Sequence, residues 1–308
     1  MHARSPRSQG PLGPALAVVG ASLLFGTTGT AQALGPGTAT PLGVGAARLV
    51  LGAAALAVIA LLSPKPGGRR WRSALPALLV GAVAVAAYHL LWFAGLRRTG
   101  VALGTIVGIG SGPVFAGLIH LVLRRTPLSR AWALGTALTV AGAALLGSRG
   151  AGGLSVDPLG IVCVVGSGFG YAVYAEAAKR AIEAGLDPRG AMAGVFVLAA
   201  VLAFPVMAIE PMGWLLTYSG AALGVHLGLV TLAVGYTLYG WGLERLPVPT
   251  VVTLTLAEPM TASLLGVVVL GERLGELGWV GVALITLGLF FAARGGSEPA
   301  RETVPLTP

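Results

Sequence analysis

The sequence has little charge and almost no cysteine. Only 10% of the 308 residues are Asp, Glu, Lys or Arg, whereas a soluble domain carries about a quarter. With 55% hydrophobic residues and a mean hydropathy of +0.85, the chain has too few charged side chains to cover a surface that faces water. The single cysteine, Cys163, excludes an internal disulfide and a cysteine-based metal cluster. The composition is that of a polytopic membrane protein.

The sequence also lacks the motifs of nucleotide and metal chemistry. Residues 108–112 (GIGSG) superficially resemble a phosphate-binding loop, but no Lys follows them and no strand–helix pattern precedes them. No HExxH motif is present, and acids such as Asp157 and Asp187 are dispersed. We therefore expect neither a cofactor nor a bound metal, and ATP-driven pumping within this chain is disfavoured.

The net charge of +9 does not indicate nucleic acid as a partner, because Lys and Arg occur in short clusters between apolar runs. With the N-terminus inside, the inner segments carry Arg4, Arg7, Lys65, Arg69, Arg70, Arg72, Arg124, Arg125, Arg130, Lys179, Arg180, Arg189, Arg245, Arg294 and Arg301. The outer loops carry only Arg97, Arg98, Arg149 and Arg273. Cationic loops stay on the cytoplasmic side, so this asymmetry predicts an inner-membrane protein with both termini in the cytoplasm.

Ten apolar runs of membrane-spanning length follow one another along the chain. We expect helices at Pro14–Leu34, Pro41–Leu62, Ala74–Leu96, Val101–Leu123, Trp132–Gly147, Pro158–Ala181, Arg189–Ile209, Tyr218–Leu243, Val248–Leu270 and Glu276–Ala293. A Gly-rich linker at 149–157 divides them into five-helix units at 13–148 and 158–293. The polar residues 1–12 and 294–308 are expected to be a disordered cytoplasmic N-terminus and a cytoplasmic tail.

The first run has an alternative interpretation. Basic residues, an apolar stretch and Ala31-Gln32-Ala33 imitate a cleavable signal peptide. The apolar stretch is longer than that of a typical signal peptide, and cleavage would leave nine helices without internal symmetry. A retained first helix is therefore favoured.

The two sets of five runs repeat one another. Pairs 146 positions apart are Pro113 and Pro259, Leu128 and Leu274, Gly135 and Gly281, and Gly142 and Gly288. Residues 95–98 (GLRR) match 242–245 (GLER) at an offset of 147, so one residue is inserted between the blocks. Five is an odd number, so the second unit must cross the membrane upside down relative to the first. The sequence thus predicts an all-α fold of ten transmembrane helices in a 5+5 inverted-topology repeat, which is typical of secondary transporters.

The run Val248–Leu270 carries an acid and a helix breaker near its middle. A carboxylate such as Glu258 costs on the order of 3 kcal/mol at mid-membrane unless it is protonated, paired or hydrated. Pro259 removes a backbone donor and kinks a helix. This combination favours a transport pathway; the alternative is a kinked packing helix with a neutral, hydrogen-bonded Glu.

Several motifs carry a family resemblance. In the C-terminal half they are residues 241–247 (WGLERLP), 256–259 (LAEP) and 270–274 (LGERL), with looser matches at Phe25-Gly26, Ala47-Arg48-Leu49 and Gly112-Pro113. They resemble the drug/metabolite transporter superfamily in its ten-helix EamA branch. The resemblance implies an inverted repeat, export of small metabolites, often amino acids or related compounds, and a cavity lined by the first, third, fourth, sixth, eighth and ninth helices. The counterpart of Glu258 is Gly112, which disfavours a symmetric two-carboxylate mechanism.

Polar and aromatic residues inside the spans are the candidate transport site. Arg48 has two interpretations, binding of a substrate carboxylate or snorkelling to the interface. Tyr88 and Trp92 share a helix face and suit an apolar or aromatic substrate, although such a pair also serves as packing or as an interface anchor. The residues expected to bind substrate or to line the cavity are Glu258, Tyr88, Trp92, Tyr171, Tyr174, Tyr236, Tyr239, Arg48, Thr28, Ser111 and Thr255.

Other residues are expected to shape the helices. Those assigned to helix packing are Gly104, Gly108, Gly112, Pro113 and Pro259. Glu176 precedes Lys179 and Arg180 by three and four positions, so a salt bridge at the helix end is expected.

The sequence therefore predicts a secondary transporter that exports small organic metabolites by alternating access. The bilayer and a small-molecule substrate are its expected partners, a proton is the candidate coupling ion, and the working unit is a monomer or a homodimer. A multidrug-type efflux carrier of the same fold is the alternative. A membrane-embedded enzyme and a channel are the alternatives from other classes.

Overall fold

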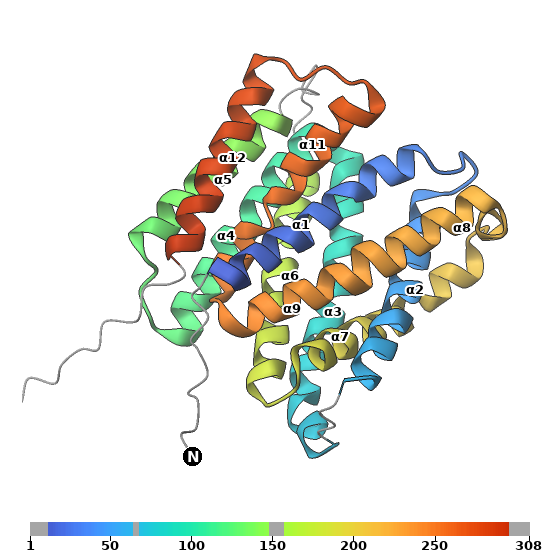
Figure 1. Ribbon diagram of the computed structural model, residues 1–308, viewed down its shortest axis with the longest axis horizontal. Coiled ribbons are helices and arrows are strands. Elements are labelled where there is room, and N and C mark those ends of the chain that lie inside the picture. Colours follow the sequence, from blue (N-terminus) through green and yellow to red (C-terminus); the bar gives the residue numbers. More distant parts are fainter. Residues whose placement is uncertain (1–11, 64–67, 148–156, 296–308) are drawn as a thin grey trace, which may run out of the picture.

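The computed structural model describes residues 12–63, 68–147 and 157–295, and these contain ten helical spans long and apolar enough to cross a membrane (Figure 1). The first seven are α1 (Leu12–Ala33), α2 (Pro41–Leu61), α3 (Gly68–Thr99), α4 (Val101–Arg124), α5 (Arg130–Gly147), α6 (Pro158–Glu183) and α7 (Pro188–Ile209). The eighth comprises α8 (Tyr218–Val225), η3 (His226–Val234) and α9 (Gly235–Arg245), preceded by a short 3-10 helix, η2 (Gly213–Leu216). The ninth comprises α10 (Val248–Leu254) and α11 (Ala257–Leu270), and the tenth is α12 (Glu276–Gly295). The expected all-α fold with ten spans is confirmed.

Several helices begin at caps that the sequence encodes locally. The side chain of Thr40 accepts the backbone N–H of Gly43 at the start of α2, and Asp157 and Asp187 accept backbone N–H groups at the starts of α6 and α7. A proline follows each of these caps in the first turn, where its missing N–H leaves no helical bond unmade. These three boundaries agree with the expected ones to within one residue.

The outer surface of the described helices is apolar. Large side chains such as Val122, Val162 and Val268 are mostly exposed along helices α4, α6 and α11. Exposed aliphatic side chains of this kind are stable in contact with lipid hydrocarbon, whereas a water-facing surface would carry many more charges. The spans therefore present their outward faces to lipid.

The ninth span is broken, and the break precedes the expected kink. Helix α10 ends at Leu254 and α11 begins at Ala257, so Thr255 and Leu256 separate two helical pieces. The N–H of Glu258 bonds to the carbonyl of Thr255 at 2.9 Å, a tight i→i−3 bond. Pro259 lies one residue further on, within the first turn of α11, where a proline is tolerated. The proline therefore begins the second piece instead of bending one continuous helix.

The eighth span contains a wide π-helical segment. Its nine residues, His226–Val234, lie between the α-helical pieces α8 and α9. Such segments are rare and often occur at functional sites, because the wider turn shifts the side chains that follow it around the helix. The periodicity of the apolar residues did not predict this change.

The central helices pack as two groups of three. Helices α3, α4 and α6 pack on one another, which we call the first group; in the second group α1 packs on both α9 and α11. Two further pairs, α2 with α7 and α5 with α12, lie to the sides of these groups, and α5 and α12 run side by side in Figure 1.

Helices α5 and α12 meet at matched glycines. A Cβ added to Gly135 would lie 2.6 Å from the carbonyl oxygen of Gly288, and one added to Gly288 would lie 2.6 Å from that of Gly135. Gly142 and Gly281 face each other in the same reciprocal way. The order of these contacts makes the helices antiparallel. Gly135 contacts Gly288, the repeat counterpart of Gly142, and Gly142 contacts Gly281, the repeat counterpart of Gly135. Two antiparallel repeats related by a two-fold rotation would produce this pattern.

A second pair of contacts has the same relation. A Cβ on Gly95 of α3 would clash with Val164 of α6, and one on Gly242 of α9 would clash with Val18 of α1. Gly242 lies 147 positions after Gly95, and Val164 lies 146 positions after Val18. In each contact the glycine belongs to one five-helix unit and the valine to the first helix of the other unit. The two helix groups are therefore built alike, and each contains the first helix of the opposite unit: α6 in the first group and α1 in the second.

Candidate functional site

Five tyrosines from three helices meet where the two helix groups adjoin. Tyr174 of α6 lies at the centre, with its ring centroid 6.1 Å from Tyr239 and 6.4 Å from Tyr236 on α9. It also lies 5.3 Å from Tyr171 on its own helix and 6.2 Å from Tyr88 on α3. These separations are typical of aromatic packing. The structure thus brings together five of the residues that the sequence singled out.

The hydroxyl groups make this tyrosine cluster more than an apolar core. Tyr174 and Tyr239 are fully buried, and within the described residues neither hydroxyl has a partner in hydrogen-bond geometry. An unsatisfied buried hydroxyl costs about 1–3 kcal/mol. The cluster therefore holds polar groups that a polar ligand or a bound water would satisfy.

Two phenylalanines that the sequence reasoning did not select complete the cluster. Phe196 of α7 lies 4.2 Å from the ring of Tyr236, and Phe25 of α1 lies 4.9 Å from it on the other side. Phe25 belongs to one of the motifs that carry the family resemblance, and that motif was the available signal. Nothing in its local sequence sets Phe196 apart from other apolar residues of its span.

Arg48 and Glu258 lie beside the tyrosines with opposite charges. Arg48 on α2 is half-buried and interacts electrostatically with Tyr88, Tyr236 and Glu258. Its Nε is buried without a hydrogen-bond partner among the described residues. The Nε of Arg48 is therefore covered by protein, and substrate binding and snorkelling both stay as interpretations of this residue.

Glu258 on α11 lies within electrostatic reach of Arg48. Its side chain is exposed, and its electrostatic neighbours Arg48, Tyr88 and Tyr236 come from three different helices. Neither Glu258 nor Arg48 forms an ion pair within 4.0 Å in the part of the chain that the structure describes. The two charges share a region without neutralising each other directly.

Thr255 connects the tyrosine cluster to the break in the ninth span. The hydroxyl of Tyr171 donates to Thr255 Oγ1 at 3.2 Å, and Thr255 Oγ1 donates to the carbonyl of Val252 at 2.8 Å. Thr255 lies in the break three residues before Glu258. The acid and the tyrosine cluster are thus held together through one threonine.

Three of the expected site residues have other surroundings. Trp92 packs on Gly108, because a Cβ there would lie 2.5 Å from its ring. Ser111 donates to the carbonyl of Gly108 at 2.9 Å and fills the contact with Gly168 of α6. Thr28 has a buried hydroxyl without a partner among the described residues. Trp92 and Ser111 therefore serve the packing of α4 against α3 and α6.

The expected packing residues also differ among themselves. A Cβ on Gly104 would lie 2.6 Å from Leu96, whereas one on Gly112 would make ordinary contacts at 3.7 Å with Tyr171 and 3.8 Å with Val252. Gly104 and Gly108 allow close approach, while Gly112, the counterpart of Glu258, has room for a small side chain.

The π-helical segment is tied to α1 by a histidine. Thr27 donates to the carbonyl of Leu24 at 2.7 Å, so its oxygen is free to accept from His226 Nε2 at 2.8 Å. This bond places a polar link between η3 and α1, two residues after Phe25. Sequence inspection alone offers no reason to pair these two residues.

A separate cleft of about 1060 Å³ lies between α2, α3 and α7 and is lined by residues such as Trp71, Leu78 and Val197. None of the expected site residues lines it. Within the described residues no three His, Cys, Asp or Glu side chains gather where they would hold a metal ion.

Comparison with known proteins decides the family. The EamA-like transporter family model matches residues 12–148 and again residues 158–294. The chain belongs to the EamA-like transporter family. Both copies of the family unit match, which agrees with the repeat seen in the glycine contacts.

Relatives within the EamA-like family are transporters. The chain is 38% identical over 275 residues to the uncharacterized transporter YwfM of Bacillus subtilis, covering 89% of this chain and 91% of that protein. It is 30% identical over 288 residues to the threonine/homoserine exporter RhtA of Escherichia coli, covering 91% and 89%. A solved crystal structure shares the fold with a TM-score of 0.78 at 23% identity, covering 92% of this chain and 97% of the other. The resemblance to the EamA branch is confirmed, and this chain is a multi-pass membrane transporter.

Proposed function

We propose that this transporter exports small zwitterionic metabolites of the amino-acid class across the cytoplasmic membrane. The observation that carries the proposal is the separation of Arg48 and Glu258, two opposite charges that lie within electrostatic reach of each other and, in the part of the chain that the structure describes, form no ion pair. A free amino acid has a carboxylate that suits a guanidinium and an ammonium that suits a carboxylate. Bound between them, it would neutralise both protein charges at once, which lowers their cost within the membrane.

The tyrosine cluster supports the same substrate class. Tyr88, Tyr171 and Tyr236 offer hydroxyl groups beside the charged pair, while their rings provide an apolar wall. A short side chain with a hydroxyl group would find both kinds of partner there. The relative RhtA is a threonine/homoserine exporter, and both of these compounds have this chemistry.

The transport step follows from the repeat. In the proposed mechanism the two helix groups rock about the site, which opens alternately to either side of the membrane. The proposed orientation has both termini in the cytoplasm, and with them the C-terminal ends of α6 and α9; the Lys and Arg asymmetry supports it. Glu258 occurs in one unit only, so a single carboxylate would carry any coupled proton.

Counterflow in proteoliposomes tests the proposal. Vesicles preloaded with unlabelled threonine, homoserine or another neutral amino acid should accumulate the labelled compound, and Glu258→Gln should slow this exchange at least tenfold. Glu276→Gln is the matched control, because Glu276 is exposed in the first turn of α12. Its rate should equal that of the unchanged protein. Exchange of hydrophobic cations but of no zwitterion would favour the multidrug alternative, and single-channel currents would favour a channel.

Proton coupling is tested in the same vesicles. A pH gradient imposed without a substrate gradient should drive net uptake in the unchanged protein. Glu258→Gln should respond no more strongly than protein-free vesicles. Gradient-driven uptake that survives in Glu258→Gln would remove this carboxylate from the coupling step.

A further inference from the structure

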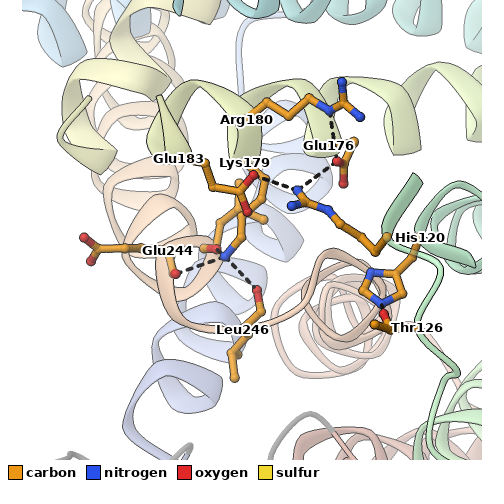
Figure 2. Close-up of polar contacts among 10 residues, drawn as sticks. His120, Thr126, Glu176, Lys179, Arg180, Glu183, Glu244 and Leu246 are labelled. Carbon is orange, nitrogen blue, oxygen red and sulfur yellow. Dashed lines mark hydrogen bonds and ion pairs between the residues drawn. The ribbon is translucent and has the colours of Figure 1, made fainter. Parts of the chain in front are cut away.

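Lys179 occupies an unusual position at the end of α6. Its ammonium donates to three backbone carbonyls, those of Leu243 at 2.7 Å, Glu244 at 3.0 Å and Leu246 at 3.3 Å, and Figure 2 shows this group. An ammonium has three donors, and all of them are used here. The expected helix-end salt bridge of Glu176 is formed with Arg180, at 3.2 Å, and Lys179 takes no part in it.

The carbonyls that Lys179 contacts need an outside donor. They lie in the last turn of α9 and just beyond it, where a helix leaves its carbonyls without intrahelical partners. Helix α9 ends without a glycine cap, since Leu246 is extended and Pro247 follows. A cation at a helix C-terminus also complements the helix dipole. Lys179 therefore caps α9 from a different helix.

This cap joins the two helix groups. Lys179 lies on α6 of the first group, while the capped carbonyls belong to α9 of the second. Helix α10, the first piece of the ninth span, also contacts α4 and α6, and the tyrosine cluster joins α6 to α9. In the described residues α1 and α11 share at most marginal contact with α3, α4 and α6. The first group is therefore held to α9 and α10, and only marginally to α1 and α11.

Two acids next to Lys179 offer its ammonium an alternative position. Glu176 and Glu183 lie one turn before and one turn after it, within electrostatic reach. Both are held by Arg124 of α4, at 3.0 Å and 2.8 Å (Figure 2). Lys179 could pair with either acid after leaving α9, so the closed and the open arrangement each provide partners for the charge. A group with two alternative sets of partners is what a two-state element requires.

The internal repeat shows that this cap has no equivalent at the other end. The position 146 residues before Lys179 is Ala33, the last residue of α1, which has no side-chain donor. The charged bond that Lys179 makes between the groups therefore has no counterpart at the repeat-related position.

We propose that Lys179 is the positioning residue that holds the cytoplasmic end of the transporter shut, so that each transport cycle requires its ammonium to leave the C-terminus of α9 for the acids of α6. The proposal rests on the transporter function proposed above. In the resting state the transport site would then be open to the outside of the cell. Substrate from the cytoplasm would enter only while Lys179 is released.

Distances between spin labels test this directly. In a Cys163→Ala background, labels on cysteines replacing Ala184 and Arg245 report the ends of α6 and α9, and labels replacing Leu34 and Arg97 report the opposite end. Lys179→Met should add a population with a longer inner distance and a shorter outer distance. Arg189→Gln, on an exposed residue of α7 that bonds to Ser63 and pairs with neither acid, should match the parent protein, and Lys179→Arg should largely retain the closed distances.

A second variant guards against misfolding of Lys179→Met. Arg124→Gln releases Glu176 and Glu183, so the open population should grow while Lys179 is still present, and it should grow no further when both changes are combined. Unchanged inner distances in folded Lys179→Met or in Arg124→Gln would overturn the proposal. So would a longer inner distance with an unchanged outer one, because that result means fraying of α9. These distances are measured without substrate. They therefore test the role of Lys179 even if the counterflow experiment shows that the protein does not transport amino acids.

Discussion

The hydroxyl of Tyr171 on α6 donates a 3.2 Å hydrogen bond to Thr255, which lies in the break between α10 and α11. This bond joins the first helix group to the residue three positions before Glu258. It crosses the interface that alternating access would have to reshape. The tyrosine cluster is therefore hydrogen-bonded to a side chain that lies in the break of the ninth span.

Removing either partner of this bond should slow transport by a similar factor. We expect Tyr171→Phe and Thr255→Val each to reduce the counterflow rate about three- to tenfold, since a neutral hydrogen bond contributes about 0.5–1.5 kcal/mol. The double variant should be no slower than the worse single variant, because the second change removes nothing further. Multiplied effects in the double variant would show that the two side chains act separately.

Arg48 should determine the preference for a free carboxylate. In Arg48→Gln, competition by threonine amide should become as effective as competition by threonine, whereas the unchanged protein should prefer threonine by about 10- to 100-fold, the value of a charge-assisted hydrogen bond of 1.5–3 kcal/mol. Inhibition constants from counterflow measure this ratio. A ratio that is the same in both proteins would place the substrate carboxylate elsewhere.

The antiparallel contact of α5 and α12 should not tolerate a methyl group. A Cβ on Gly135 would meet backbone atoms of α12 at 2.5 and 2.6 Å, and backbone cannot rotate away. Gly135→Ala should therefore destabilise the protein by about 1–3 kcal/mol, the usual cost of overpacking. Thermal unfolding in detergent measures the effect.

Gly29 provides the matched control for this test. It lies within α1, and a Cβ there would meet nothing within 4 Å. Gly29→Ala should leave the melting temperature unchanged or raise it, because alanine favours helix over glycine. Equal destabilisation by both substitutions would argue against close packing as the cause.

Asp157 should stabilise the start of α6 in a pH-dependent way. Its carboxylate accepts the N–H groups of Gly160 and Leu159 and pairs with Arg98 at 3.2 Å, and these bonds lower the pKa of Asp157 below its ordinary value of 3.8. Because the folded-state pKa is the lower one, the stabilisation is present above pH 3.8 and is lost as the pH falls through the folded-state value. Asp157→Ala should therefore melt earlier than the parent protein at neutral pH.

The difference between the two melting temperatures should shrink as the medium is acidified below pH 3.8, because Asp157 is then increasingly protonated in both states. Asp157→Asn keeps a capping oxygen and should lie between the two. A difference that stays constant from neutral to acid pH would assign the effect to packing rather than to the charged cap.

Much of the architecture follows from composition and spacing. Ten apolar runs predict ten spans, and the boundaries agree to within a few residues except at the start of α3, which begins six residues before the expected Ala74. Caps such as Asp157 and Asp187 are local, so they can be recognised without the fold. The offset of 146 residues predicts that the two units share contacts, as Gly135 and Gly288 do.

The details of the site depend on long-range packing. The sequence placed a kink at Pro259, whereas the break lies at Thr255 and Leu256, where the hydroxyl of Tyr171 from a distant span bonds to the side chain of Thr255. The sequence did not predict the contact of Phe196 with Tyr236 or the bond between Thr27 and His226, because in each case the two partners lie on different helices.

By itself the sequence determined the membrane class, the number of spans and the repeat, because hydrophobicity and spacing are properties of local segments. Only the tertiary structure decided that Arg48 lies within electrostatic reach of Glu258 and that the side chain of Lys179 on α6 caps α9. A charged side chain chooses among partners that lie far apart in the chain, and the choice depends on which donors and acceptors the packed helices leave unsatisfied.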